Sequence, residues 1–144
     1  ALHRVDYAAV GLADYGKPGN YFARQIGRWS KQYVASETER IDAMDRLMAW
    51  LPAAIPPGDE TTVVHGDYRI GNFMFTEPDG AFSAVLDWEL AHLGDFHEDL
   101  AWSVQRLFGV PREDGELLIS GLLPRDEFFA AYAEAAGETV DLDT

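Results

Sequence analysis

Two apolar segments of the chain end in polar residues whose types suit phosphoryl transfer. Residues 61–64 lead into a loop that contains Asp67 and, five residues later, Asn72. A second apolar run, residues 84–86, ends directly before Asp87. Phosphoryl transfer from a nucleotide needs a carboxylate that orients the attacking hydroxyl and accepts its proton, and oxygen ligands for magnesium. We therefore predict Asp67 as the catalytic base, and Asn72 and Asp87 as the residues that bind the metal and, through it, the nucleotide.

Each of these residues also has an ordinary structural interpretation. Asp67 could cap a helix or a turn, because Asp is common in loops. Asn72 could be a turn residue with positive φ, since it follows a glycine. Asp87 could cap the end of a strand. The order and spacing of all three residues together favour the catalytic interpretation over three unrelated caps.

The motifs around these residues resemble those of a known family. His65-Gly66-Asp67, with Asn72, is similar to the H-x-D-x-x-x-x-N catalytic loop of the protein-kinase-like phosphotransferases. Asp87-Trp88-Glu89 resembles their metal-binding segment. Together with the G-D-x-x-x-D-L-A pattern at residues 94–101, these motifs most resemble the aminoglycoside phosphotransferase family. A weaker resemblance, which reaches back to residues 2–6, is to the branch that is sometimes fused to acyl-CoA dehydrogenases.

The resemblance implies a donor, a metal and an acceptor. The phosphoryl donor would be ATP, with GTP as the alternative, and Mg²⁺ would be the metal. The acceptor would be a hydroxyl group of a small molecule, either aminoglycoside-like or of a hydroxyacyl type. Acceptor pockets are built from variable helices, so the sequence alone leaves the acceptor open.

The resemblance also implies residues that support the site, namely His65, Arg69 and Asp99. We expect Asp99 to brace the backbone of the catalytic loop, with helix capping as the alternative. Two further acids, Glu89 and Asp95, could act one step away from the metal or the loop, although such acids are often only solvated. Phe96 stands where the family usually has proline, which leaves the backbone path at that point open.

Composition narrows the range of partners. The formal net charge of −14 argues against nucleic acid and against an anionic membrane surface, both of which favour clustered Lys and Arg. A cationic acceptor would be attracted, although acidity is also a common aid to solubility. The chain has no cysteine and no apolar run long enough to cross a bilayer, which fits a cytoplasmic protein. The oligomeric state stays open.

The chain has 144 residues, which is enough for one domain but short for a two-lobed kinase-like enzyme. Its two lysines, Lys17 and Lys31, lie outside apolar strand runs, and Gly16-Lys17-Pro18-Gly19 does not form a phosphate-binding loop. We therefore expect residues 1–144 to be a single domain, the large lobe, without the small lobe that clamps ATP. Two alternatives remain: a catalytically silent kinase-like binding module, and a metal-dependent hydrolase that uses His92 and His97.

Local patterns predict a mostly helical α+β fold with a short β-hairpin at the site. Strands are expected at 61–64, 73–75 and 82–86, with a turn at 77–80. Helical periodicity or end signals predict helices over 21–34, 97–107 and 124–137, and a short helix within 1–13. A capping box at 36–39 predicts a further helix with a buried face that includes Ile41 and Leu47.

Overall fold

The computed structural model describes residues 2–58, 60–137 and 140, and these residues form an α+β fold. The α-helices are α1 (Tyr21–Ser36), α2 (Asp42–Trp50), α3 (His97–Ser103) and α4 (Arg125–Ala136). The strands are β1 (Thr62–Val64), β2 (Phe73–Phe75), β3 (Phe82–Val85), β4 (His92–Gly94), β5 (Gly109–Pro111), β6 (Leu117–Ile119) and β7 (Leu123–Pro124). Short 3-10 helices occupy Leu2–Arg4, Leu51–Ala53, Ile70–Asn72, Trp88–Leu90 and Arg106–Phe108. None of the described helices is long and apolar enough to span a membrane.

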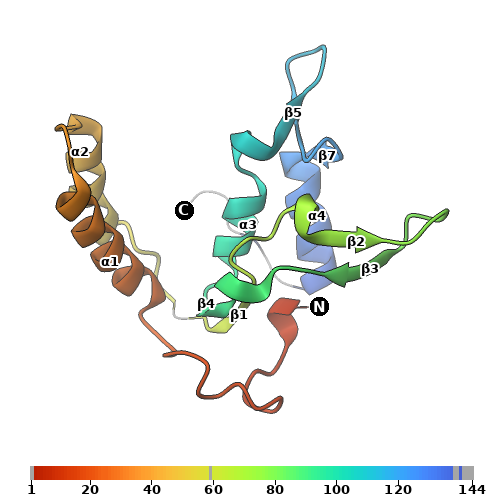
Figure 1. Cartoon of the computed structure of the whole chain (residues 1–144), viewed down its shortest axis with the longest axis horizontal. Coiled ribbons are helices and arrows are strands. Elements are labelled where there is room, and N and C mark those ends of the chain that lie inside the picture. The colour runs from red at the N-terminus through yellow and green to blue at the C-terminus, as the bar shows by residue number, and fades with distance from the viewer. Residues whose placement is uncertain (1, 59, 138–139, 141–144) are drawn as a thin grey trace.

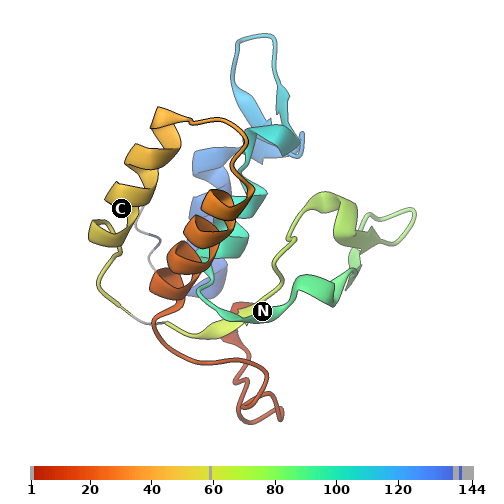
Figure 2. The same cartoon turned by 60° about the vertical axis from the view of Figure 1, so that its left-hand side comes forward.

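Helices α1 and α2 form an arm to one side of the strands and the other two helices (Figures 1 and 2). Helix α1 forms where the sequence predicts it, but the capping box at residues 36–39 does not start α2. The Ser36 hydroxyl instead donates to the carbonyl oxygens of Gln32 and Tyr33, at 2.9 and 3.2 Å, and so closes α1. The predicted buried face of α2 is wrong for Ile41 and Leu47, which are 45% and 42% exposed.

The predicted hairpin is present and carries the loop of interest at its start. Strands β2 and β3 pair antiparallel, with Phe73 opposite Val85. The expected turn at residues 77–80 joins them, and the N–H of Thr76 donates to the carbonyl oxygen of Ala81 at 2.8 Å across it. A 3-10 turn ends at Asn72, directly before β2, and Asp87 follows β3 closely, so the two residues lie at the same end of the hairpin.

A second antiparallel pair, β1 with β4, anchors the start of the loop. Val64 lies opposite His92 in this pair, and Val63 and Leu93 are buried within it. The sequence predicts β1 but not β4. Beyond this pair, Phe96 and Leu100 of the α3 region pack with Phe129 of α4 to form the hydrophobic core.

Other elements are shorter than predicted or were not predicted at all. Helix α3 ends at Ser103 rather than Leu107, and a separate 3-10 turn follows it. In the described part of the N-terminal segment, Leu2–Arg4 forms a 3-10 helix, and a single turn follows in which the N–H of Val10 donates to the carbonyl oxygen of Asp6 at 3.1 Å. Strands β5, β6 and β7 form an antiparallel sheet before α4. This sheet was not predicted from the sequence. Helix α4 begins after Pro124 and ends at Ala136, and Gly137 follows in the left-handed conformation expected of a C-terminal cap.

Candidate active site

The loop that contains Asp67 and Asn72, which the sequence predicts to be the catalytic loop, begins at a sharp change of direction directly after β1. Gly66 has φ of +84°, and a Cβ atom on it would lie 2.7 Å from the carbonyl oxygen of Leu90. An L-amino acid other than glycine would therefore be strained in its backbone and would clash with the chain. This turn carries the chain away from the buried β1–β4 pair and presents Asp67 beyond it.

The carboxylate of Asp99 holds this turn from helix α3. Its Oδ2 accepts from the backbone N–H of His65 at 2.8 Å, and its Oδ1 accepts from the N–H of Gly66 at 2.8 Å. His3 Nε2 lies 3.0 Å from the same Oδ2, and the Asp99 side chain is fully buried. Both N–H groups lack a strand partner here, so the buried carboxylate satisfies them and they satisfy it.

The His65 side chain joins the loop to the end of the hairpin. Its Nε2 lies 2.9 Å from the carbonyl oxygen of Leu86, and its Nδ1 lies 3.2 Å from the backbone nitrogen of Asp67. A carbonyl can only accept and a backbone N–H can only donate, so the neutral tautomer with the proton on Nε2 fits both contacts. The buried ring therefore fixes the distance between Asp67 and the residue before Asp87.

The carboxylate of Asp67 is held by three side chains. Oδ2 accepts from Asn72 Nδ2 at 2.8 Å, and Oδ1 accepts from Trp102 Nε1 at 2.7 Å. Arg69 Nε is shared between the two oxygens, at 3.1 and 3.0 Å. Burial tends to raise the pKa of Asp67, but the bonds from Trp102, Asn72 and Arg69, with the charge of Arg69, outweigh it and hold this pKa below its usual value. The group is therefore ionised at neutral pH.

A backbone hydrogen bond brings the segments that contain Asn72 and Asp87 together. The N–H of Leu86 donates to the backbone carbonyl of Asn72 at 2.8 Å, which places Asp87 one residue beyond this contact. Asp87 is exposed and has φ of +65°, a strained conformation that Asp tolerates better than most residues. Among the described residues no side chain bonds its carboxylate, whereas Asn72 is buried and donates its side-chain amide to Asp67.

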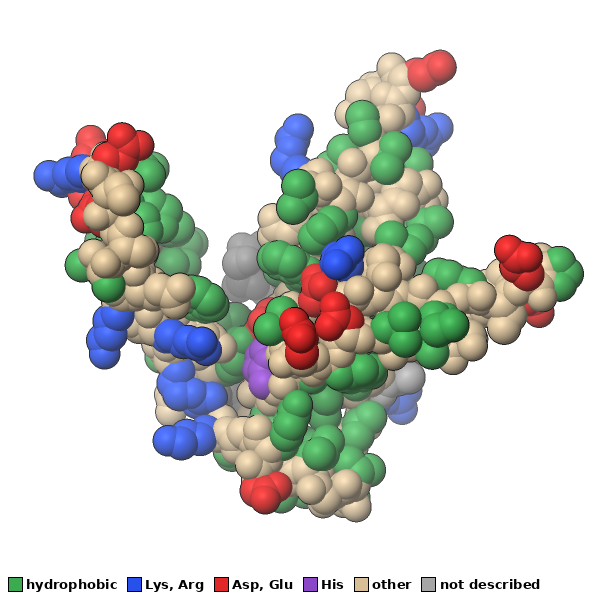
Figure 3. Space-filling model, viewed as in Figure 1, with side chains coloured by type: hydrophobic (Ala, Val, Ile, Leu, Met, Phe, Trp, Pro, Cys, Tyr) green, Lys and Arg blue, Asp and Glu red, His purple; other side chains and the backbone are tan. Residues whose placement is uncertain are grey.

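The two other acids singled out from the sequence lie in different surroundings. Glu89 is exposed on the 3-10 turn Trp88–Leu90 that follows Asp87. The Asp95 carboxylate instead accepts from the backbone N–H of His97 at 3.0 Å and lies 2.6 Å from His97 Nδ1, so it closes a turn directly before α3. Figure 3 shows Asp and Glu side chains gathered at the centre of one face, next to a hollow between the α1–α2 arm and the rest of the molecule.

A separate polar cluster joins His92, at the start of β4, with Tyr21 and Glu98. The Tyr21 hydroxyl donates to a carboxylate oxygen of Glu98 and lies 2.9 Å from His92 Nε2, which is 3.2 Å from the same oxygen. Burial raises the pKa of Glu98 to about 7, and the negative charge of Asp99 adds to the increase. His92, one of the two histidines considered for a hydrolase, is thus engaged in a link between α1, β4 and α3.

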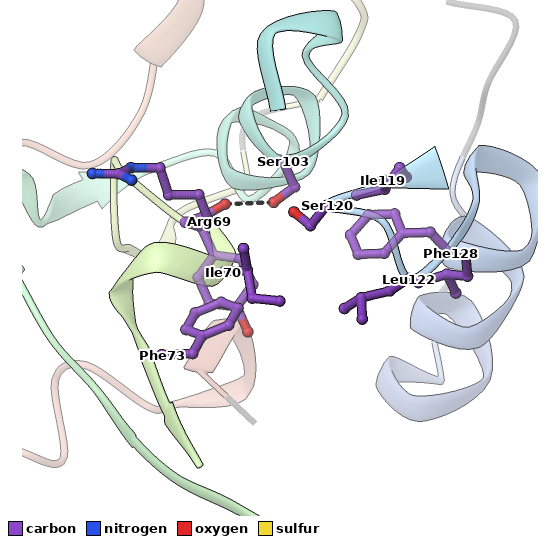
Figure 4. A pocket seen from close by; sticks show the side chains of 10 residues that line it. Arg69, Ile70, Phe73, Ser103, Ile119, Ser120, Leu122 and Phe128 are labelled. Atoms are coloured by element: carbon purple, nitrogen blue, oxygen red, sulfur yellow. Dashed lines mark hydrogen bonds between the residues drawn. The ribbon is translucent and has the colours of Figure 1, made fainter. Parts of the chain in front are cut away.

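A small pocket of about 80 Å³ lies behind the catalytic loop. Figure 4 shows Ile70 and Phe73 on one side and Leu122 and Phe128 on the other, with the Arg69 side chain pointing away from the space between them. The Ser103 hydroxyl donates to the carbonyl oxygen of Tyr68 at 2.7 Å at its edge. The pocket is mostly apolar and lies on the side of the loop away from the Arg69 guanidinium.

Sequence reasoning missed three residues that contact the site: His3, Trp102 and Ser103. A signal for two of them was present, because Asp99, Trp102 and Ser103 stand at positions i, i+3 and i+4 of one helix and must share a face. No spacing rule could have connected His3 with Asp99, since the two are brought together only by the tertiary fold.

A model of the phosphotransferase enzyme family matches residues 1–141 of the chain. Acyl-CoA dehydrogenase family member 10 of Mus musculus is 48% identical over 138 residues, which cover 91% of this chain and 13% of that protein. The probable acyl-CoA dehydrogenase IBR3 of Arabidopsis thaliana is 37% identical over 155 residues, covering 96% of the chain and 19% of that protein. The chain thus spans less than a fifth of the length of these curated relatives.

Two solved structures are similar. A proposed aminoglycoside phosphotransferase from Ralstonia eutropha JMP134 superposes with a TM-score of 0.84 at 45% identity, covering 98% of this chain and 45% of that one. A macrolide 2'-phosphotransferase type I gives a TM-score of 0.69 at 19% identity, covering 96% and 42%, and shows the fold alone. The motifs and these relatives agree: the chain belongs to the phosphotransferase enzyme family, in the branch that includes segments of acyl-CoA dehydrogenase family members.

Proposed function

We propose that the protein transfers the γ-phosphoryl group of ATP to a hydroxyl group of a small molecule. In this proposal Asp67 orients the acceptor hydroxyl and takes its proton, and Asn72 and Asp87 bind Mg²⁺. GTP is the alternative donor. His65, Arg69 and Asp99 support the catalytic loop, and Glu89 contributes through water. Asp95 acts only at a distance, by holding the turn before α3.

One observation carries the proposal: Asn72 is hydrogen-bonded both to Asp67 and to Leu86, the residue before Asp87. Its side-chain amide donates to the Asp67 carboxylate at 2.8 Å, while its backbone carbonyl accepts from the residue before Asp87 at 2.8 Å. Both hydrogens of the amide are used on Asp67, since Nδ2 also lies 2.8 Å from the Asp67 carbonyl oxygen. The amide oxygen of Asn72 is therefore the part that remains for a ligand.

The oxygen groups at this position fit a magnesium ion. The Asp87 carboxylate has no protein partner among the described residues, and Asp87 is exposed with its backbone in the left-handed region. Carboxylate and amide oxygens are hard ligands, and Mg²⁺ usually keeps a few protein ligands with phosphate and water oxygens completing its octahedron. When bound, the ion would neutralise the charge of the donor phosphates.

Two kinds of acceptor remain in the proposal. The net charge of −14 favours a cationic acceptor of the aminoglycoside type. The similarity to acyl-CoA dehydrogenase family members favours a hydroxyacyl compound, because the two activities would then share a substrate class. The exposed apolar side chains of Trp88 and Leu90, next to Asp87, offer a surface for such a compound.

We further propose that residues 1–144 are a single domain, the large lobe, and that a small lobe elsewhere in the protein clamps the nucleotide. The chain covers 45% of its solved relative from R. eutropha. Calorimetric titration of this chain with MgATP tests the proposal, and weak binding is expected. Tight binding by the chain alone would show that the nucleotide site does not need a second lobe.

A phosphorylation screen of the full-length protein tests the function itself. Aminoglycosides and hydroxyacyl compounds would be offered with MgATP, each beside a matched compound that lacks the hydroxyl. Phosphate should appear only on the hydroxyl compounds and should be lost in an Asp67→Asn variant. ATP binding without transfer to any acceptor would favour a silent binding module, and phosphate release in the absence of an acceptor would favour a hydrolase.

A further inference from the structure

Helix α3 holds the catalytic loop with one face. Asp99 bonds the backbone N–H groups of His65 and Gly66, and Ser103, one turn later, donates to the carbonyl oxygen of Tyr68 at 2.7 Å. Trp102 lies on the same face and is directed at Asp67, the residue between these anchors. The helix therefore contacts four consecutive residues of the loop, and only Trp102 contacts a group proposed to touch the acceptor.

The contact from Trp102 is short and undivided. Its indole N–H donates to Oδ1 of Asp67 at 2.7 Å, and the indole has no other donor with which to replace it. An N–H bond to an ionised carboxylate is stronger than one between neutral groups. The indole ring packs edge-on against the ring of Phe108, with 5.5 Å between the ring centroids, which limits its rotation.

The donors around Asp67 differ in how easily each can give way. Asn72 and Trp102 each make a single bond of 2.8 or 2.7 Å to one oxygen. Arg69 Nε is shared between both oxygens at 3.1 and 3.0 Å, which are longer than the contacts from Asn72 and Trp102. A carboxylate offers about four acceptor positions, and these contacts fill them all. An incoming hydroxyl must therefore displace one donor, and the shared contact of Arg69 is the weakest.

We propose that Trp102 is a positioning residue for Asp67: its indole N–H pins Oδ1 so that the carboxylate keeps its orientation when the acceptor hydroxyl displaces Arg69. Asn72 holds the other oxygen, Oδ2, with its side-chain amide. This inference depends on the proposed phosphoryl transfer, because it assigns Trp102 a role through Asp67 alone.

The bond itself can be tested in the chain without any assay of activity. The four tryptophans give four indole N–H signals in a ¹H–¹⁵N spectrum. The Trp102 signal should exchange with water more slowly than those of the largely exposed Trp29 and Trp50, and Asp67→Ala should move it while leaving theirs in place. The proposal would be overturned if the Trp102 signal exchanged as fast as the signals of Trp29 and Trp50. It would also be overturned if Asp67→Ala left the chemical shift of the Trp102 signal unchanged.

The role is tested by kinetics of the full-length protein. Trp102→Phe keeps a ring against Phe108 and removes the N–H, and Trp29→Phe is the matched control on an exposed helix face. We expect Trp102→Phe to lower kcat by about tenfold or more, the effect of losing a charge-assisted bond, with the KM for ATP and the melting temperature unchanged. Unchanged kcat in Trp102→Phe, beside an inactive Asp67→Asn, would reject the positioning role and leave the proposed function standing. Wild-type turnover in Asp67→Asn would reject the proposed function instead.

Discussion

The side-chain amide of Asn72 bonds both the carbonyl oxygen and the carboxylate of Asp67, at 2.8 Å each. The two hydrogen bonds join residues five positions apart into a ring. Through them the Asn72 amide holds both the backbone and the carboxylate of Asp67. A shorter or longer loop would separate the two functions. Both amide hydrogens of Asn72 are used on Asp67, so the amide oxygen takes no part in this ring.

Asp67→Asn should lower kcat of the full-length protein by about 10²–10⁴-fold, because proton acceptance by a positioned base contributes about that much. The KM for ATP should change little, since Asp67 is proposed to act on the acceptor and not on the nucleotide. Steady-state kinetics at varied ATP measures both constants. Asp114→Asn, in the exposed β5–β6 loop, is the control and should match the wild type. Turnover near that of the wild type in Asp67→Asn would remove the main support for the kinase interpretation.

Asp87→Asn should raise the magnesium concentration needed for half-maximal rate by about tenfold or more, because a neutral amide is a poorer ligand for a hard dication than a carboxylate. Turnover at saturating magnesium should also fall. The measurement is the rate at fixed ATP over a range of magnesium concentrations. Glu89→Gln provides the comparison, and its effect should be much smaller because it is proposed to act through water. Equal effects of the two substitutions would argue that Asp87 is not a direct ligand.

The hairpin and its turn could be predicted because their signals are local. The turn at 77–80 and the apolar runs on either side of it all lie between residues 73 and 86. By contrast, β4 has three residues and exists because Val64 offers it a partner, which no local pattern records. Ser36 shows a different limit: its hydroxyl can cap a new helix or bond back to the preceding turn, and the sequence does not distinguish the two.

The site residues likewise divide into those that local sequence patterns could predict and those that they could not. The residue types and spacings of Asp67, Asn72 and Asp87 lie within one continuous segment, so motif reasoning could single them out. By contrast, His3 contacts Asp99 across a separation of 96 residues, and Trp102 contacts Asp67 across a separation of 35 residues. Contacts across such separations depend on how helices pack, and this packing cannot be predicted from the periodicity of a single segment.

Asp99→Asn should destabilise the protein by about 2–4 kcal/mol, because it leaves a buried backbone donor facing an amide that also donates. Asp99 accepts from the N–H groups of His65 and Gly66, and an asparagine has only one acceptor atom for the two. Urea unfolding measures the change. Asp126→Asn, exposed in the first turn of α4, should shift the free energy of unfolding by no more than about 0.5 kcal/mol. A similar result for both variants would mean that Asp99 does not brace the loop.

The Glu98 cluster should make stability fall as the pH rises. Burial raises the pKa of Glu98 from its usual 4.5 to about 7, so between these values the folded protein holds a proton that the unfolded chain has lost. Ionisation therefore favours the unfolded chain, and the contribution of Glu98 is greatest below pH 4.5 and is lost by about pH 7. His92, Tyr21 and Asp99 face this carboxylate, so the titration belongs to the cluster rather than to one isolated acid.

Glu98→Gln replaces the carboxyl group with a neutral group of similar shape and should remove this loss. Relative to the wild type, the variant should gain stability steadily from about pH 4.5 to about pH 7, with no further gain above that range. The difference in free energy of unfolding between the two proteins, measured by urea at several pH values, isolates the effect from other titrations. Glu127→Gln, on the exposed side of α4, should give a difference that does not vary with pH. If Glu98→Gln instead loses stability as the pH rises, the carboxylate is stabilised by His92 more than burial opposes it, and the direction assigned to the pKa of Glu98 is wrong.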